Sequence, residues 1–375
     1  MFFKMLKRLR IVIDGNACKF ESKGFLVFFT MIQEELDDEY FYTTKTCLNE
    51  LKFKNGILIS AELGEYNQGI HYVLCKQNRK RQWWKWHFAP SMTIDLRDES
   101  GCVDLSRRKN LAIGIIVIAN ILSQSCENIL SFFVTLQSEL AFYVGCLNLY
   151  DSLSEKGEPV SFPILYGLGR RKYSVNGLYD VSLALILGEK VIGNNVNAEY
   201  KDLIIVTGAN QGGKSTFLRS VGQAQLMMQC GLFVAAKSFS ADICDGIFTD
   251  YKKEEDVTMK SGKLDEELSR MNDIVRFIRP NSMILFNESF SATNEREGSE
   301  IGRQIVSALL EKKIKVFFVS HLYDFSHSFY EKKMDNAIFL RAERQANGHR
   351  TFQLSEGEPL PTSFGEDLYN KIFAP

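Results

Sequence analysis

The sequence predicts an α/β fold, in which an α/β domain with a parallel-strand core follows a mainly helical segment. An apolar run at 203–206 leads into a glycine-rich turn and then into a helical pattern. Two later apolar runs, at 283–286 and 315–319, end in polar side chains, as buried parallel strands do. Between 104 and 154, apolar residues recur at steps of three and four, which indicates one or two long helices.

The glycine-rich turn at 207–216 fits the pattern G-x-x-x-x-G-K-[ST], with Gly208, Gly213, Lys214 and Ser215 in the fixed places. Glycines let successive backbone N–H groups point at phosphate oxygens, and the N-terminus of the following helix adds its positive dipole. We expect Lys214 to reach the β- and γ-phosphates, Ser215 to hold Mg²⁺ through its hydroxyl, and Thr216 to begin the helix. The other loop positions expected to contact phosphate are Ala209, Asn210, Gln211 and Gly212. The alternative is a glycine-rich turn without a ligand, which the flanking strand and helix patterns disfavour.

Polar side chains follow the two later strands. Asn287 and Glu288 come directly after the run at 283–286, and His321 comes shortly after the run at 315–319. In nucleotide hydrolases the first such position normally holds an acid of the Mg²⁺ shell, and the second holds an acid that polarises water. Here Asn287 takes the first place and Glu288 the second, and His321 is placed to sense or stabilise a γ-phosphate. A histidine satisfied inside the core is the alternative for His321.

The composition is that of a folded protein, with 375 residues, 45% hydrophobic residues and a formal net charge of −1. This length predicts two or three domains, and the near-neutral charge means that nucleic-acid binding would need a local patch or a partner. The eight scattered cysteines include no C-x-x-C pair and indicate reduced thiols in a cytoplasmic protein. The basic start has no signal-peptide core. The apolar run at 111–122 is shorter than the ~20 residues of a membrane span, so we expect a buried helix there and no membrane contact.

The first hundred residues combine several patterns. Residues 25–36 look helical, and the acidic run at 37–39 is expected to be the solvated end of that helix. The runs at 57–63 and 70–74 predict two strands of a hairpin. Residues 76–87 hold all three tryptophans among basic side chains, a composition that can stack on bases and neutralise phosphates. We favour the alternative of a polar loop whose tryptophans pack on the hairpin, because the cluster is short and has no surrounding positive field.

Glycine and proline residues at 151–163 punctuate the end of the long helical stretch. We therefore divide the chain into an N-terminal mixed α/β segment at 1–103, a long-helix connector at 104–160 and an α/β domain at 161–375. Long helices of this kind suit a lever that moves relative to a motor.

Several motifs are more specific than a generic phosphate loop. The string T-G-A-N-Q-G-G-K-S-T at 207–216, the segments at 231–236 and 245–249, Thr293 with Gly298, and S-F-G at 363–365 occur in this order. Together they resemble the C-terminal ATPase domain of MutS proteins, a branch of the ABC ATPase superfamily, over roughly 175–365. The helical segments at 129–133 and 139–143 resemble the long helices that join the MutS core to its ATPase.

The resemblance implies an ATP-binding, Mg²⁺-dependent ATPase that binds DNA and forms a homodimer through its ATPase domain. It assigns the phosphates to the backbone of 208–213 and to Lys214, and the water-orienting role to Glu288. It places Ser215 and Asn287 at the metal and His321 at the γ-phosphate. The base pocket is expected from 191–195, with no stacking residue fixed.

Some residues depart from the family pattern. Asn287 replaces the magnesium-shell aspartate, so it can accept a hydrogen bond from a metal-bound water but supplies no charge. The signature segment that acts on the partner's nucleotide aligns with 261–264, where Gly262 falls near the usual serine. The sequence ahead of 175 is too short for a full mismatch-recognition domain, and no nuclease domain is expected after Phe373. We therefore expect a shortened MutS-like form.

Two functions remain open from the sequence. The first is a slow DNA-linked ATPase that couples nucleotide state to the long helices, in DNA repair or recombination, with mismatch recognition carried only by analogy. The second is a nucleotide-gated dimerising switch or scaffold with little hydrolysis, because Asn287 weakens the metal shell. The ATPase subunit of an ABC transporter is disfavoured, because the chain has no L-S-G-G-Q string.

Overall fold

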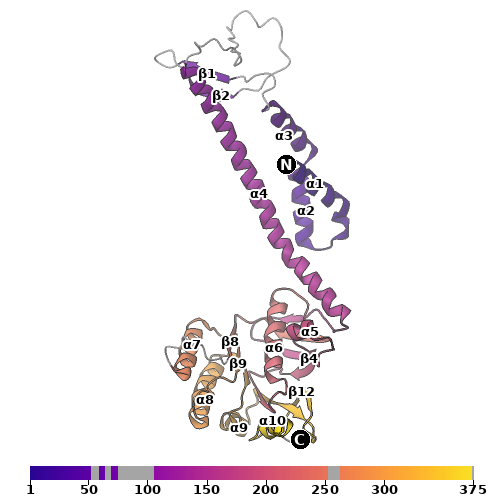
Figure 1. Cartoon of the computed structure of the whole chain (residues 1–375), viewed down its shortest axis with the longest axis vertical. Coiled ribbons are helices and arrows are strands. Elements are labelled where there is room, and N and C mark those ends of the chain that lie inside the picture. The colour runs from indigo at the N-terminus through magenta and orange to yellow at the C-terminus, as the bar shows by residue number, and fades with distance from the viewer. Residues whose placement is uncertain (52–58, 64–68, 75–104, 252–261, 374–375) are drawn as a thin grey trace, which may run out of the picture. The chain divides into compact units, whose positions relative to one another are not determined.

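The computed structural model of the chain describes residues 1–51, 59–63, 69–74, 105–251 and 262–373 (Figure 1). It divides into two compact units, Met1–Ala141 and Phe142–Pro375, which are described separately below. The helix α4 (Leu105–Glu155) passes from the first unit into the second. The prediction of a long helix between 104 and 154 is therefore confirmed as a single element.

The first unit begins with short helices and a hairpin. These elements are α1 (Phe2–Asn16), the 3₁₀ turn η1 (Ala17–Lys19), α2 (Lys23–Glu35), α3 (Asp38–Glu50), β1 (Ile59–Leu63) and β2 (Gly69–Leu74). The strands pair antiparallel, as the sequence predicts. The helices share a small core that includes Leu6, Ile13 and Ile32, and Ile129 and Phe132 of α4 pack against it.

The acidic run at 37–39 begins a helix, so the expectation that it ends one was wrong. Leu36 ends α2, and the carboxylate of Asp37 accepts a hydrogen bond from the backbone N–H of Tyr40 at 2.6 Å. A carboxylate at this position satisfies a free N–H group and complements the positive end of the helix dipole. An acidic run is compatible with either side of a helix boundary, and only the local hydrogen bond distinguishes them.

The surface of α4 is more apolar than we expected. Ile116 and Ile121, within the run predicted to form a buried helix, are exposed. In the described part of the chain, one segment, Ala119–Glu155, is long and apolar enough to cross a membrane by length and composition alone. This is weak evidence, and the absence of membrane contact stays a prediction. The basic tryptophan cluster at 76–87 lies outside the described residues.

The second unit is built on a six-stranded sheet in the order β12-β11-β6-β10-β9-β8. Its strands are β6 (Leu203–Gly208), β8 (Ile247–Tyr251), β9 (Met283–Asn287), β10 (Lys315–Val319), β11 (Ala337–Arg344) and β12 (Arg350–Glu356). All pair in parallel except β12, which lies antiparallel to β11 at one edge. The predicted α/β class and the parallel strands at 203–206, 283–286 and 315–319 are confirmed.

Alternate residues of the central strands face two separate cores, as expected for a sheet covered on both sides. Ile204 and Val206 join the core formed with α6 (Lys214–Gln229) and a second sheet. That sheet has the order β3-β7-β4-β5, with β3 (Ile164–Tyr166), β4 (Tyr173–Leu178), β5 (Asn194–Asn197) and β7 (Ser238–Asp242). Leu203 and Ile205 face the other core, formed with α7 (Lys263–Phe277), α8 (Glu295–Glu311) and α9 (Tyr323–Glu331). The remaining helices are α5 (Val181–Ile186) and α10 (Gly365–Phe373).

The close contact between α8 and the turn after β9 gives a stability prediction. A Cβ atom on Gly298 would lie 2.2 Å from the backbone oxygen of Phe290, whereas one on the helical Gly145 would meet nothing within 4 Å. We expect Gly298→Ala to lower the free energy of unfolding by about 1–3 kcal/mol through overpacking. Gly145→Ala, the matched control in α4, should raise it by up to about 1 kcal/mol through helix propensity. Urea unfolding followed by circular dichroism measures both, and equal effects of the two variants would contradict the packing argument.

Candidate functional site

The glycine-rich loop connects β6 to α6 and packs closely against β11. Gly208 has a φ of 104° and Gly213 a φ of 88°, values that strain residues with a Cβ atom. A Cβ on Gly208 would lie 2.9 Å from the backbone nitrogen of Ala342, and one on Gly212 would lie 2.8 Å from the Ala342 Cβ. The glycines are therefore required both for the turn and for its distance from β11. The predicted helix after the loop is confirmed, but α6 begins at Lys214, two residues before the expected Thr216.

Lys214 is folded back onto the loop that precedes it. Its Nζ donates hydrogen bonds to the backbone oxygens of Gly208 and Ala209, both at 2.9 Å, and the residue is 5% exposed. The pKa of Lys214 is lowered to about 8, mainly by burial; the charge of Glu288 opposes this shift and that of Arg350 adds to it. A buried ammonium held only by neutral carbonyls is stabilised by any anion that approaches the loop.

Glu288, His321 and Ser363 form a continuous chain of hydrogen bonds. Glu288 Oε1 lies 2.9 Å from His321 Nε2, and His321 Nδ1 lies 2.9 Å from the Ser363 hydroxyl. Glu288 follows β9 and His321 follows β10, and these adjacent strands bring the two side chains together. The backbone oxygen of Ser363 accepts from the N–H of Asn210 at 3.0 Å, which ties the chain to the loop.

Two oxygens near the strand ends lack partners within the described residues. Asn287, the last residue of β9, has a buried side-chain oxygen with no hydrogen bond, and so does the Thr207 hydroxyl beside the loop. Ser215 is exposed at the start of α6 and lines the same cavity as Glu288. A carbonyl oxygen and a hydroxyl are ligands that suit a hydrated Mg²⁺. Of the two residues expected at the metal, Ser215 lines the cavity, whereas Asn287 is not among its lining residues.

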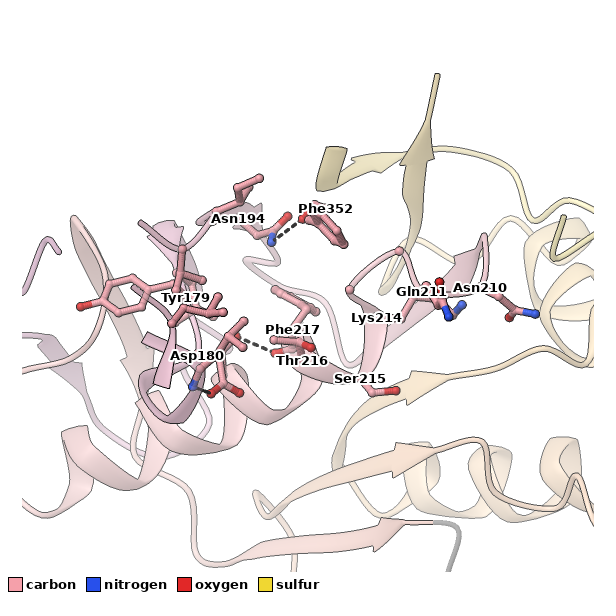
Figure 2. A pocket seen from close by; sticks show the side chains of 18 of the residues that line it. Tyr179, Asp180, Asn194, Asn210, Gln211, Lys214, Ser215, Thr216, Phe217 and Phe352 are labelled. Atoms are coloured by element: carbon pink, nitrogen blue, oxygen red, sulfur yellow. Dashed lines mark hydrogen bonds between the residues drawn. The ribbon is translucent and has the colours of Figure 1, made fainter. Parts of the chain in front are cut away.

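A cavity of about 540 Å³ extends from the loop toward α5 (Figure 2). The loop and α6 line it with residues 210–217, and Glu288 and His321 border the same space. Apolar side chains line the part formed by α5 and the segment before β5; these are Leu183, Leu187, Val191 and Ile192. The predicted base pocket at 191–195 therefore contributes Val191, Ile192 and Asn194 to the cavity, although its role stays a prediction. A polar end and an apolar end in one cavity suit a ligand that has both phosphate groups and a planar ring.

Two residues of β12, Arg350 and Phe352, also contact the loop or the cavity, although the sequence did not predict this. Phe352 lines the cavity, has a φ of 59° and lies over the loop, because a Cβ on Gly213 would be 3.7 Å from its side chain. Its backbone oxygen accepts from Asn194 at 3.2 Å, and Figure 2 shows these two residues side by side. Arg350 donates to the backbone oxygen of Asn210 at 3.1 Å and pairs with Asp367 at 2.7 Å. Their sequence context, an ordinary edge strand, gave no signal for either role.

Comparisons with known proteins match nearly the whole chain to two domain families. Residues 1–156 match the MutS2 N-terminal domain, and residues 204–374 match MutS domain V. The chain belongs to the MutS family. The resemblance to the MutS family is thereby confirmed, and the match at 1–156 includes the helical segments at 129–133 and 139–143 and extends to the residues before them.

Individual relatives match less than half of this MutS-family chain. The DNA mismatch repair protein MutS of Clostridium botulinum strain Alaska E43 is 31% identical over an alignment of 176 residues, which covers 41% of this chain and 19% of that protein. The protein of the same name from Microcystis aeruginosa is 33% identical over 187 residues, 46% of this chain and 21% of that protein. MutS protein homolog 4 of Mus musculus is 32% identical over 146 residues, an alignment that covers 39% of this chain and 15% of that protein. The chain thus spans about a fifth or less of the length of these relatives.

The lowered pKa of Lys214 predicts a specific pH dependence of stability. The folded-state pKa of about 8 lies below the unfolded value of 10.5, so burial of the ammonium opposes folding below pH 8. Between about pH 8 and pH 10.5 the unfolded chain binds more protons, and stability must rise with pH. We expect wild type to gain on the order of 1–3 kcal/mol relative to Lys214→Met across this range. Urea unfolding at several pH values measures the difference. The exposed Lys312→Met is the control, and a pH-independent gap between wild type and Lys214→Met would contradict the burial argument.

Proposed function

We propose that this MutS-family chain binds ATP with Mg²⁺ in the 540 Å³ cavity, hydrolyses it slowly and couples the nucleotide state to DNA binding. The observation that carries the proposal is the Glu288–His321–Ser363 chain at the edge of the cavity, beside the glycine-rich loop. A loop alone supports phosphate binding, whereas an oriented carboxylate beside it supports activation of water. The family relationship and the names of the relatives support the link to DNA.

In this proposal each end of the cavity has its own task. The backbone N–H groups of 208–213, the Lys214 ammonium and the dipole of α6 hold the phosphates. Leu183, Val191 and Phe352 provide apolar and aromatic surface for the base. Mg²⁺, held through Ser215 and the amide oxygen of Asn287, would supply charge neutralisation at the phosphates.

Glu288 is the group that orients the attacking water. Its hydrogen bond to His321 fixes the direction of the carboxylate, and Ser363 in turn fixes the imidazole ring. Both ring nitrogens of His321 are engaged in this chain, so a direct role at the γ-phosphate would require His321 to exchange one of these bonds for a bond to the phosphate. Ser363 acts as a positioning residue, because it reaches the reaction only through His321.

Contacts at the end of α4 support the coupling of nucleotide state to the long helix. Lys156, directly after α4, donates to the backbone oxygens of Ala184, Leu185 and Leu187 at 2.7–2.9 Å. Glu158 accepts from the backbone N–H of Val191 at 2.6 Å. Leu187 and Val191 line the cavity, so a ligand that displaces this wall also displaces the end of α4. In the proposed homodimer, formed through the ATPase domain, this movement of the end of α4 would change the affinity for DNA.

The decisive experiment measures steady-state ATP hydrolysis with and without duplex and branched DNA. Lys214→Ala and Glu288→Ala should each lower kcat by about 100-fold or more, because each removes charge stabilisation or water orientation. Glu300→Ala, which removes an exposed carboxylate on α8, is the control and should leave the rate unchanged. Turnover that needs both residues and changes with DNA would support the DNA-linked ATPase.

The second candidate function is a nucleotide-gated dimerising switch, and Asn287 is the observation that favours it. A neutral amide at the metal holds the ion less tightly than a carboxylate, so ATP would be bound but hardly cleaved. If wild type binds ATP yet hydrolyses it no faster than Lys214→Ala and Glu288→Ala, with or without DNA, the enzyme proposal fails and the switch takes its place.

Restoring the carboxylate tests how much the amide at position 287 limits turnover. We expect Asn287→Asp to raise kcat by about tenfold and to lower the Mg²⁺ concentration needed for half-maximal rate, since metal-shell substitutions have effects of this size. Magnesium titrations of the ATPase rate measure both quantities. Asn347→Asp adds the same charge in an exposed turn and serves as the control. An unchanged magnesium requirement in Asn287→Asp would show that this side chain does not contact the metal shell.

A further inference from the structure

The turn that carries Glu288 has an unusual backbone conformation. Glu288 has a φ of 58° and Phe290 a φ of 62°, so two of three successive residues lie in the left-handed region. Residues with a Cβ atom adopt this region at a cost, and a bulky side chain such as phenylalanine rarely does so. Such a conformation persists only where the surrounding structure holds it. The contacts of this turn therefore decide where the Glu288 carboxylate points.

Neighbouring elements hold the first peptide group of the turn and the Phe290 ring. The backbone N–H of Glu288 donates to the backbone oxygen of Val319 in β10 at 2.9 Å. The Ser291 hydroxyl donates to the backbone oxygen of Glu288 at 2.7 Å. The Phe290 ring is fully buried in the core that the sheet shares with α8 and α9.

The next peptide group of the turn is held from α7. The N–H of Phe290 donates to Glu267 Oε2 at 3.0 Å, and Glu267, on the buried face of α7, is 4% exposed. A hydrogen bond from a backbone N–H to a carboxylate is charge-assisted and stronger than one to a neutral acceptor. The bond therefore fixes the orientation of the peptide group that begins one residue after Glu288.

A second bond joins the same turn to β8. The buried Ser289 hydroxyl donates to the backbone oxygen of Asp250 at 2.9 Å, and the Asp250 carboxylate accepts from Arg270 Nε of α7 at 3.2 Å. This bond anchors the Ser289 side chain, whereas the bond to Glu267 sets the rotation of the peptide group that follows. α7 thus reaches the turn directly through Glu267 and indirectly through Arg270.

We propose that Glu267 is a positioning residue for Glu288, an inference that rests on the proposed ATPase function. Its carboxylate holds the Phe290 N–H and keeps the turn in its left-handed conformation, which aims the Glu288 carboxylate at His321 Nε2. Without this bond the backbone relaxes, and Glu288 loses its direction toward His321 and toward the attacking water. Glu267 does not line the cavity, so it acts on the reaction only through the turn.

The first test compares ATP hydrolysis with ATP binding in variants of the full chain. Glu267→Ala removes the acceptor and should lower kcat at least about tenfold, while the Kd for ATP changes less than about twofold. Glu267→Gln keeps an oxygen acceptor on a side chain of the same length and should restore most of the rate. Asp273→Ala removes an exposed carboxylate from the same helix and is the control.

The Glu288→Ala background separates positioning from a general loss of stability. If Glu267 acts through Glu288, Glu267→Ala should change the residual rate of Glu288→Ala less than about twofold, whereas independent effects would multiply. A further loss of about tenfold in this background would overturn the proposal. A kcat of Glu267→Ala equal to that of wild type would also overturn it, and would leave the ATPase function standing.

A spectroscopic measurement tests the same contact without turnover. The chain has five histidines, so the ring signals of His321 in protein with isotope-labelled histidine can be assigned by their loss in His321→Gln. We expect Glu267→Ala to shift these signals toward those of Glu288→Ala, and Glu267→Gln to retain the wild-type signals. Unchanged signals in Glu267→Ala would overturn the positioning role at any rate of hydrolysis. Shifted signals without wild-type hydrolysis would support the contact and contradict the ATPase function instead.

Discussion

The strands β6 and β9 both pair in parallel with β10, and this pairing determines where the side chains of the candidate site lie. The register places Val319 opposite Val206 on one side and Asn287 on the other. The loop after β6, Glu288 after β9 and His321 after β10 consequently emerge at one edge of the sheet. Burial of alternate residues in two separate cores fixes the register, because a shift by one residue would exchange the two faces. The same constraint places Asp202, Ser282 and Lys315 together at the opposite edge.

Much of this arrangement could be predicted from the sequence because its signals are local. A buried strand, a glycine-rich turn and a helix follow one another within 203–216, and the polar residues 287, 288 and 321 directly follow apolar runs. The hydrogen bond between Ser363 and His321 and the position of Phe352 over the loop join segments far apart in the chain. No spacing rule connects those segments, so only the folded structure brings them together.

The incorrect expectations also have physical reasons. Periodicity identified α4 as a helix, but it shows only which residues are apolar and not what covers them; Ile116 and Ile121 are therefore exposed against expectation. The acidic run at 37–39 was assigned to the wrong end of a helix. The N-cap bond of Asp37 depends on a backbone N–H three residues ahead, and composition does not reveal it. Both errors concern the surroundings of an element rather than its existence.

Under the proposed function, the electrostatics of the loop predict that Asn287 would affect phosphate binding and hydrolysis in opposite directions. Glu288 is the carboxylate that raises the pKa of Lys214, against burial and the charge of Arg350. An aspartate at position 287 would add a second negative charge beside the loop and compete with phosphate for Lys214. The neutral amide would leave more of the positive potential of Lys214 available to a polyanion, but it would contribute less to a metal ion. In the proposed ATPase, the same amide would therefore favour phosphate binding and slow metal-assisted chemistry, and a long-lived bound state would follow from both.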